Sequence, residues 1–245
     1  VVGTPQSQHL QMVFKVAEIA GWLAPPARAV HVNFGSVLGD DRKMLKSRSG
    51  DPLKFIDLID EAVARGQASM AERAPEMPAG ERDQLGQLIG VGALKYAELS
   101  SDRIKDYVFD WQRMLAFDGN TAPYLQYAHA RIGSIFRRAE TDHGIARSSV
   151  RSVAPSLAEP QERALALQVL QFDAVVHDTI DKFSPHRLCT YLFDLAQTFT
   201  SFYEACPVLK ADAATQLQRL ALCDLTARVL ECGLSLLGID APERM

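Results

Sequence analysis

Three features are scarce in this 245-residue chain: cysteines, long apolar runs and excess charge of one sign. No apolar run approaches the roughly 18 residues needed to cross a bilayer, and no signal peptide is recognisable, so we expect no membrane association. The net charge of −4 argues against a generic nucleic-acid coat. Positive charge clustered on one face would still allow RNA binding.

The four cysteines all lie in the last quarter of the chain, and none belongs to a C-x-x-C pair. A structural zinc site is therefore disfavoured, a disulfide scaffold even more so, and we expect no bound zinc. Their neighbours are mostly Leu and Ala at helical spacing, which is typical of small core residues in a reducing compartment. These residues are Cys189, Cys206, Cys223 and Cys232.

The remaining composition is that of a globular protein, with 47% hydrophobic and 23% charged residues, which excludes disorder and low complexity. The length suggests one to two domains, each able to bury a core.

The N-terminal part alternates strand and helix patterns. Residues 1–3 read as the end of a buried strand, and Thr4-Pro5 opens a helix with Thr4 as its N-cap. Apolar residues of this helix recur at helical spacing, and residues 29–34 form an alternating strand. Strand, helix and strand with short links predict a βαβ unit of a parallel sheet. A buried-strand pattern at the first residue suggests that the chain begins inside a domain.

Farther along, helical patterns dominate. A helix is expected from Pro52 to about Arg65, then a weak stretch over 67–80, another helix to about Leu99 and a short apolar segment over 107–111. From residue 121 onward we place helices near 121–142, 160–182, 185–205 and 210–237, with Ser184 as an N-cap. The predicted fold is an α/β fragment over residues 1–115 followed by an all-α helical bundle over 116–245, predominantly α overall.

The strongest local motif is Lys43-Met44-Leu45-Lys46-Ser47, in a polar loop directly after a parallel strand. Ligands bind at such positions in α/β sheets. Flexible ammonium groups suit a phosphate chain, because they act as point charges that follow a moving leaving group. The alternative is a solvated basic loop with no ligand.

This pentapeptide resembles the Lys-Met-Ser-Lys-Ser signature of class I aminoacyl-tRNA synthetases, with Leu45 in place of the middle Ser. In that class the loop binds ATP and stabilises its triphosphate, with Mg2+ expected. The resemblance implies that Lys43 and Lys46 are catalytic, through electrostatic stabilisation of the transition state. It also implies that Met44 and Ser47 bind ATP.

Further sequence segments narrow the resemblance to one family of this class, because their residues and their order along the chain are similar to those of arginyl-tRNA synthetases. The segment Gly3-x-x-Gln6-x-x-His9 is similar to the family's Gly-x-x-Gln-x-x-His, and Asn33–Val37 to the strand and turn before its lysine loop. Gly3, Gln6, His9 and Val37 are accordingly expected to bind ATP. Other matching blocks lie at residues 92–100, 107–111, 120–132, 185–196 and 243–245. Residues 1–115 would then be the C-terminal part of a Rossmann-type catalytic domain, and 116–245 a helical anticodon-binding domain named for an Asp-Ala-Leu-Arg motif.

The predicted tRNA-binding residues lie mainly in the helix that begins at residue 121. Residues 121–151 carry five arginines against two acidic residues, a local charge of +3 in a chain of −4. Arginines hold phosphates, and aromatic rings stack on splayed bases. The alternative is that the tyrosines belong to the core and the arginines to a solvated face. The candidates are Tyr124, Tyr127, Arg131, Arg137 and Arg138, with His186, Arg187 and Met245 from the later blocks.

The resemblance implies an arginine–tRNA ligase, which couples arginine and ATP to arginyl-adenylate and transfers arginine to tRNA-Arg. None of the six histidines lies in the His-x-Gly-His sequence that class I enzymes need. We therefore expect the N-terminal half, with the arginine pocket, to lie outside this chain, and the chain alone to be inactive. A cytoplasmic, monomeric full-length enzyme is expected. The alternatives are a noncatalytic tRNA-binding fragment or paralogue, and a helical protein-interaction domain.

Overall fold

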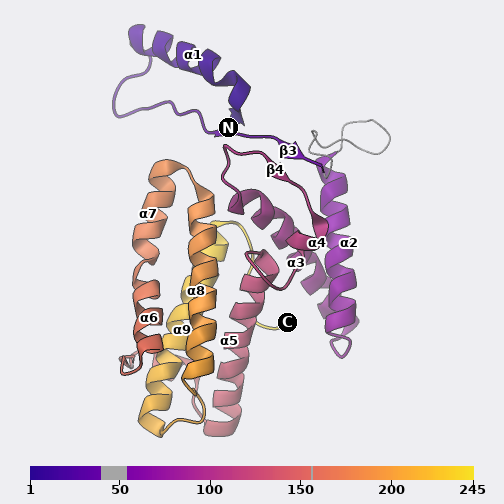
Figure 1. Cartoon of the computed structure of the whole chain (residues 1–245), viewed down its shortest axis with the longest axis vertical. Helices are drawn as coiled ribbons and strands as arrows, with labels where there is room; N and C mark the ends of the chain where they lie inside the picture. The colour runs from indigo at the N-terminus through magenta and orange to yellow at the C-terminus, as the bar shows by residue number, and fades with distance from the viewer. Residues whose placement is uncertain (40–53, 156) are drawn as a thin grey trace. The chain divides into compact units, whose positions relative to one another are not determined.

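The computed structural model describes residues 1–39, 54–155 and 157–245, and they fold into two compact units. The first comprises Val1–Leu53 and Ser101–Asp110, and the second Lys54–Ser100 and Trp111–Met245. Figure 1 shows the few short strands and the long helices that make up these units. In the described part of the chain, no helix is both long enough and apolar enough for a bilayer crossing.

In the first unit, a parallel strand pair is connected through a helix. β1 (Val2–Gly3) pairs in parallel with β2 (Asn33–Phe34), and η1 (Thr4–Gln6) and α1 (Ser7–Ile19) lie between them in the chain. This confirms the predicted βαβ unit, although the second strand is shorter than the predicted 29–34.

Two expectations about this region are wrong. Thr4 does not cap a helix; its hydroxyl donates to the Phe34 carbonyl, 3.0 Å away, and so joins the turn after β1 to the end of β2. The first strand is not buried either, since Val2 is 38% exposed. The helix that follows is also open to solvent: Val13 is 45% exposed, and no residue of α1 is buried. The reason is geometric, since a pair of two-residue strands offers too little surface to cover a helix within this unit.

A second parallel pair joins β3 (Val37–Leu38) to β4 (Tyr107–Val108). The turn before β3 is clamped from both sides: the amide of Gly35 donates to the Arg103 carbonyl at 2.7 Å, and the guanidinium of Arg103 donates to the Asn33 carbonyl at 2.6 Å. A Cβ at Gly35 would lie 2.6 Å from the Lys105 carbonyl oxygen, so only glycine fits there.

The second unit begins with a helical hairpin, α2 (Phe55–Arg73) and α3 (Ala79–Ser100). The prediction that the first helix ends near Arg65 is wrong, because it continues to Arg73. Gly66 has a low helix propensity, but it lies directly against α3, where a Cβ would meet the Gly86 carbonyl oxygen at 2.1 Å. Packing between the two helices therefore overrides propensity at this position.

A bundle follows, and most predicted helices are confirmed. Its elements are α4 (Trp111–Met114), α5 (Ala122–His143), η2 (Arg147–Val150), α6 (Pro160–Leu170), α7 (Phe172–Lys182), α8 (Pro185–Ala205) and α9 (Ala213–Leu236). The predicted helix 160–182 is two helices, separated at Gln171. At this break the Gln168 carbonyl accepts hydrogen bonds from the Gln171 amide, at 3.2 Å, and from the Tyr191 hydroxyl, at 2.8 Å.

The helix ends explain where the bundle turns. Thr121 caps α5 by accepting from the Tyr124 amide at 3.3 Å, and Gly144 ends this helix in the left-handed region, with φ of 66°. Ser184 is not the predicted side-chain cap of α8, because its hydroxyl donates back to the Lys182 carbonyl at 3.0 Å.

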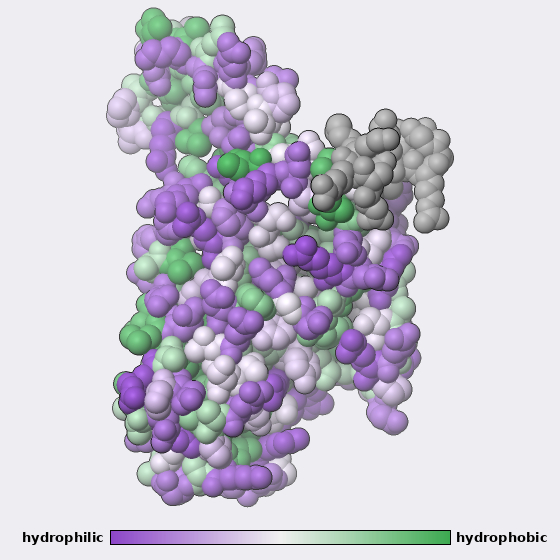
Figure 2. Space-filling model, viewed as in Figure 1, coloured by the Kyte–Doolittle hydropathy of each residue, from purple (hydrophilic) through white to green (hydrophobic). Residues whose placement is uncertain are grey.

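The main core lies among α5, α8 and α9. Ile132 and Phe136 are buried there, together with Phe199 and Phe202. Cys232 is exposed, so the prediction that all four cysteines are core residues holds only for the other three. Figure 2 shows mainly hydrophilic residues on the visible face of the helices, with small separate apolar patches between them.

Candidate functional site

Three of the predicted ATP-binding residues of the first unit lie where β1 leads into α1. Gly3 ends β1, and Gln6 and His9 are exposed in the turns that follow. Among the described residues, the atom nearest to a Cβ built at Gly3 is 3.6 Å away, so the described fold does not require glycine there. A ligand that approaches the backbone would require it, and the roles of these three residues toward ATP stay predictions.

The predicted lysine loop, with Lys43, Met44, Lys46 and Ser47, lies outside the described residues. Val37, by contrast, lies in β3, where it pairs with Tyr107. β3 lies between the predicted strand at 29–34 and the lysine motif, in a stretch that the sequence pattern predicts as loop, so the strand that precedes the motif in the chain is not the predicted one.

In the second unit, four of the predicted tRNA-binding residues share one stripe of α5. Tyr124, Tyr127, Arg131 and Arg138 are spaced by three, four and seven residues, which places them on the same side of a helix. Tyr127 is 46% exposed, so the alternative that it belongs to the core is wrong. Arg138 is exposed as well. An aromatic ring and a guanidinium are therefore available to a ligand along this side.

The other two members of the stripe are supported by α8. The Tyr124 ring lies 5.6 Å from the Phe193 ring, between centroids, and the Arg131 guanidinium lies 4.6 Å from the centre of the Tyr203 ring. Such contacts hold the side chains in one orientation and leave their polar groups able to bind. Preorganised cationic and aromatic groups of this kind suit a nucleic acid, whose phosphates and bases need both.

A different stripe of α5 carries the tail, which we define as residues 238–245. Gln126, His129, Gly133 and Arg137 succeed one another at spacings of three, four and four residues. Their partners are backbone carbonyls of the tail: Gln126 Nε2 lies 2.9 Å from the Asp240 oxygen, His129 Nδ1 lies 3.0 Å from the Pro242 oxygen, and Arg137 Nη1 lies 2.9 Å from the Glu243 oxygen. The tail is thus fixed along α5 by its backbone.

Gly133 completes this stripe by its lack of a side chain. A Cβ there would lie 3.0 Å from the Glu243 carbonyl oxygen and 3.0 Å from its Oε2 atom. The predicted tRNA-binding residue Arg137 therefore has a defined partner in the tail, apart from the side of α5 that carries Tyr127.

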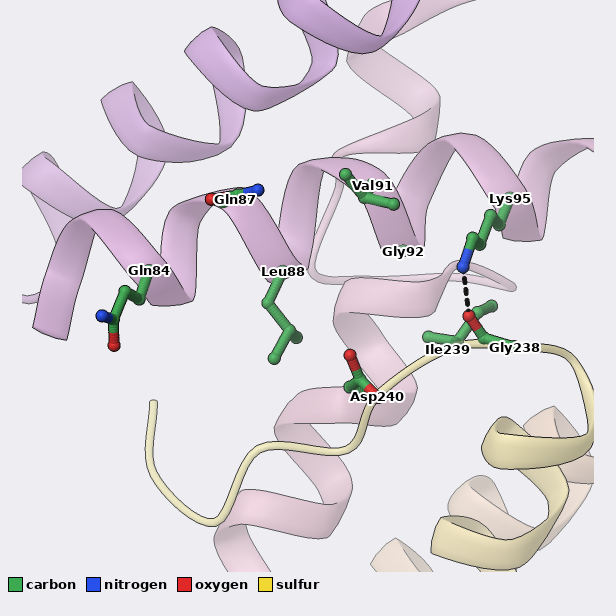
Figure 3. Close-up of a pocket in the computed structure, with 9 residues that line it drawn as sticks. All are labelled: Gln84, Gln87, Leu88, Val91, Gly92, Lys95, Gly238, Ile239 and Asp240. Atoms are coloured by element: carbon green, nitrogen blue, oxygen red, sulfur yellow. Dashed lines mark hydrogen bonds between the residues drawn. The ribbon is translucent and has the colours of Figure 1, made fainter.

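The tail also passes along α3, as Figure 3 shows. Lys95 donates its ammonium hydrogen to the Gly238 carbonyl, and a cavity of about 220 Å³ lies between helix and tail. Farther on, Met245 packs against an apolar cluster of Met70, Leu85 and Ile89. The residue predicted from the sequence to contact tRNA is thus seated against the α2–α3 hairpin.

Charged groups tie the tail to the bundle. The Asp224 carboxylate of α9 is fully buried, and it accepts from Arg147 Nε at 2.8 Å and from Arg228 Nε at 2.9 Å. Arg147 also faces the tail, with 3.6 Å between its Nη1 atom and Oε1 of Glu243. Two guanidinium groups thus compensate one buried carboxylate, and one of them reaches the tail.

The predicted residues His186 and Arg187 lie at the start of α8, beside a cleft of about 510 Å³ that α7 and α8 line with Gln168 and Gln171. Arg187 Nη1 lies 2.7 Å from Oδ2 of Asp178. A hydrogen bond from Lys182 and the charge of Arg187 hold the pKa of the Asp178 carboxyl below its usual value. Nδ1 of His186 is buried, with no hydrogen-bond partner among the described residues. His186 and Arg187 are separate from both stripes of α5, and their role in tRNA binding stays a prediction.

Of the α5 and η2 residues that contact the tail, Arg137 is a predicted site residue, whereas Gln126, His129 and Arg147 are not. Gln126, His129 and Arg147 bind groups that lie 77 to 114 residues away in the chain, so no local pattern reveals them. One signal was present: polar residues recur on a side of α5 that is otherwise buried, which predicts a polar partner for that side.

Comparison with known proteins agrees with this arrangement. Residues 1–111 match the family of tRNA synthetases class I (R), catalytic domain, and residues 125–245 match the DALR anticodon binding domain. An arginine–tRNA ligase of Thermobifida fusca is 52% identical over 100% of this chain and 42% of its own length. One of Frankia casuarinae is 50% identical over 100% of this chain and 41% of its own length.

Solved structures show the same likeness. The arginyl-tRNA synthetase of Thermus thermophilus matches 100% of this chain and 40% of its own, with a TM-score of 0.84 and 33% identity. That of Plasmodium falciparum has a TM-score of 0.85 and 30% identity over 100% of this chain and 40% of its own. The chain thus spans about two fifths of the length of these relatives. The predicted fold class, an α/β catalytic fragment followed by an all-α part, is confirmed. Both family matches and these relatives agree: the chain belongs to the arginyl-tRNA synthetase family of class I aminoacyl-tRNA synthetases.

Proposed function

We propose that this chain is part of an arginine–tRNA ligase, which activates arginine with ATP and transfers it to tRNA-Arg during protein synthesis in the cytoplasm. We assign residues 1–115 to the C-terminal part of the catalytic domain and residues 116–245 to the anticodon-binding domain. The full-length enzyme is proposed to act as a monomer. Support comes from family membership and from the relatives named arginine–tRNA ligase.

In the catalytic part, Lys43 and Lys46 are proposed to stabilise the negative charge that develops on the phosphates as arginine attacks ATP. Two ammonium groups lower the barrier by electrostatics, and no covalent protein intermediate is needed. Gly3, Gln6 and His9 are proposed to bind the adenosine part of ATP. Val37, Met44 and Ser47 complete the proposed ATP site.

Mg2+ is proposed to enter with ATP as a substrate complex. Within residues 1–39, 54–155 and 157–245, no three His, Cys, Asp or Glu side chains gather as a metal site. That arrangement fits Mg2+, which is usually held by substrate phosphates and water with one or two carboxylates. No residue of the described chain is therefore assigned to the metal.

In the helical part, the observation that carries the proposal is the stripe of Tyr124, Tyr127, Arg131 and Arg138 on α5. Arginine binds phosphate, and a tyrosine that stacks on a splayed base contributes about 1–3 kcal/mol. Arg137, Met245, His186 and Arg187 are proposed as further tRNA contacts.

A second candidate is a noncatalytic tRNA-binding fragment or paralogue. It is favoured by one observation: no histidine of this sequence lies in a His-x-Gly-His motif. We accordingly expect the 245-residue chain alone not to form arginyl-adenylate. Exchange of pyrophosphate into ATP by the full-length gene product separates the two candidates, because only a ligase catalyses it.

The proposal for the helical part is tested by binding of tRNA-Arg to the 245-residue chain, beside a copy with the middle anticodon base changed. Both are measured at two salt concentrations, because phosphate contacts weaken steeply with salt. We expect the changed copy to lose about 1 kcal/mol or more. Equal, weak binding of the two RNAs would show that the chain attracts RNA only by electrostatics, without reading the anticodon. No binding of either RNA at low salt would refute the proposed anticodon role and favour a helical protein-interaction domain.

A further inference from the structure

We propose that Arg147 is a positioning residue for tRNA binding: it fixes Glu243, and thereby the end of the tail, before tRNA arrives. This rests on the proposed function of the helical part. It extends that function to a residue outside both stripes of α5, which acts through the tail and not by contact with RNA.

Arg147 is itself held in place by two helices. Its Nε atom lies 2.8 Å from Oδ1 of Asp224, a carboxylate with no exposed surface. Its guanidinium lies 5.1 Å from the centre of the Phe136 ring in α5. Contacts on both α9 and α5 leave the side chain little freedom, so its Nη1 atom points in a fixed direction.

This nitrogen faces the tail at a place where other supports converge. Arg147 Nη1 lies 3.6 Å from Oε1 of Glu243. The carbonyl of the same glutamate accepts from Arg137 Nη1 at 2.9 Å, and Gly133 provides the space beneath it. Glu243 is therefore held through both its side chain and its backbone, on the side of α5 that carries the tail.

The last two residues of the chain depend on the position of Glu243. Met245 packs on the apolar cluster of Met70, Leu85 and Ile89, only two residues farther along. A cleft of about 300 Å³ lies beside this segment and is lined by Glu81, Gln84, Glu243 and Arg244 among others. If Glu243 is released, the cleft loses one wall and Met245 loses its upstream anchor. A tail that is fixed before RNA arrives costs less ordering entropy on binding, which is why positioning raises affinity.

The structure supplies a matched pair of variants. Arg147→Met and Arg228→Met each remove one of the two guanidinium groups on Asp224, and of these two arginines it is Arg147 that reaches the tail. Arg147→Lys serves as the conservative variant, because it keeps a positive charge between the two carboxylates. Glu243→Gln removes only the negative charge that faces Arg147 and leaves Asp224 paired with both arginines, so it reports on the tail without disturbing the bundle.

The experiment has two readouts on the 245-residue chain: amide hydrogen exchange of residues 239–241 and 243–245 without RNA, and affinity for tRNA-Arg. We expect Arg147→Met and Glu243→Gln to speed exchange of the tail about three- to five-fold, as for loss of a partly exposed ion pair. Their affinity for tRNA-Arg should fall about three- to ten-fold. Arg228→Met should leave both readouts within about twofold of wild type, and Arg147→Lys should restore part of each.

The proposal is overturned if Arg147→Met and Arg228→Met change tail exchange equally, since Arg147 would then act only through the bundle. It is also overturned if the tail loosens but tRNA affinity does not change. Failure of the wild-type chain to bind tRNA-Arg would refute the proposed function and, with it, the tRNA part of this proposal. The exchange data would still decide on their own whether Arg147 fixes the tail.

Discussion

Replacement of Gly90 by alanine tests how closely the two helices of the α2–α3 hairpin must approach. A Cβ at Gly90 would lie 2.1 Å from the Ala62 carbonyl oxygen and 2.6 Å from its carbon. Both obstacles are backbone atoms, which cannot rotate away. The reciprocal contact recurs one turn along, where a Cβ at Gly66 would meet the Gly86 carbonyl at 2.1 Å. The helices must therefore separate if Gly90 gains a methyl group.

The expected change in the free energy of unfolding results from two opposed contributions. Alanine in a helix interior gains up to about 1 kcal/mol over glycine. Overpacking of a close contact costs about 1–3 kcal/mol, and more where the backbone must shift. The Ala62 side chain is fully buried at this interface, so the separation also opens space around it. We expect Gly90→Ala to lower the free energy of unfolding by about 2 kcal/mol, which for a chain of this size lowers Tm by about 4–8 °C.

The assay is thermal and urea unfolding followed by circular dichroism. Gly80→Ala is the matched control, because Gly80 lies in the same helix with no described atom within 4 Å of a Cβ, and it should be neutral or stabilising. The same stability for Gly90→Ala as for Gly80→Ala would refute the close backbone contact, and with it the geometry of the hairpin that seats Met245.

Three further predictions concern buried or capping groups. Tyr96→Phe should destabilise the chain by about 1–2 kcal/mol in urea unfolding, because it removes a hydroxyl that lies 2.6 Å from Oδ1 of Asn120 and 2.9 Å from the Cys189 carbonyl oxygen. Asp212→Ala should lower the free energy of unfolding more at pH 7 than at pH 3. Hydrogen bonds from the start of α9 lower the pKa of this carboxyl in the folded state. The stability that the ionised carboxylate contributes is therefore present above the unfolded pKa and is lost as pH falls. With a thiol reagent at pH 8, only Cys232 should react rapidly in the folded chain. Burial raises the pKa of Cys189 and Cys223 to about 12 and also raises that of Cys206, so rapid reaction of any of these three would contradict the core packing.

Much of the helical part could be predicted because its signals are local. The pattern of residues 185–205 marks α8 at both ends, and Gly144 marks the end of α5. The predictions fail where distant groups decide: the helix predicted to end near Arg65 continues through Gly66, where close packing against α3 offsets the low helix propensity of glycine. The break at Gln171 coincides with a hydrogen bond from Tyr191, which lies on another helix.

The candidate site likewise has one part that helical spacing predicts and another that depends on contacts between distant residues. The spacing of Tyr124, Tyr127, Arg131 and Arg138 predicts one stripe because helical periodicity is local. It could not show that Tyr127 is exposed, since its spacing also fits a buried stripe. The path of the tail depends on contacts over more than 100 residues, such as that between His129 and Pro242, which no spacing reveals.

The central claim is that the exposed side of α5 recognises tRNA-Arg, and Tyr127→Ala tests it most directly. Affinity of the 245-residue chain is measured for tRNA-Arg and for the copy with a changed middle anticodon base, with Phe55→Ala as control because Phe55 is an exposed aromatic residue on α2. The account predicts that Tyr127→Ala binds tRNA-Arg about tenfold more weakly, as for loss of one stacked base, and discriminates less between the two RNAs. Unchanged affinity and discrimination in Tyr127→Ala, or an equal loss in Phe55→Ala, would contradict it.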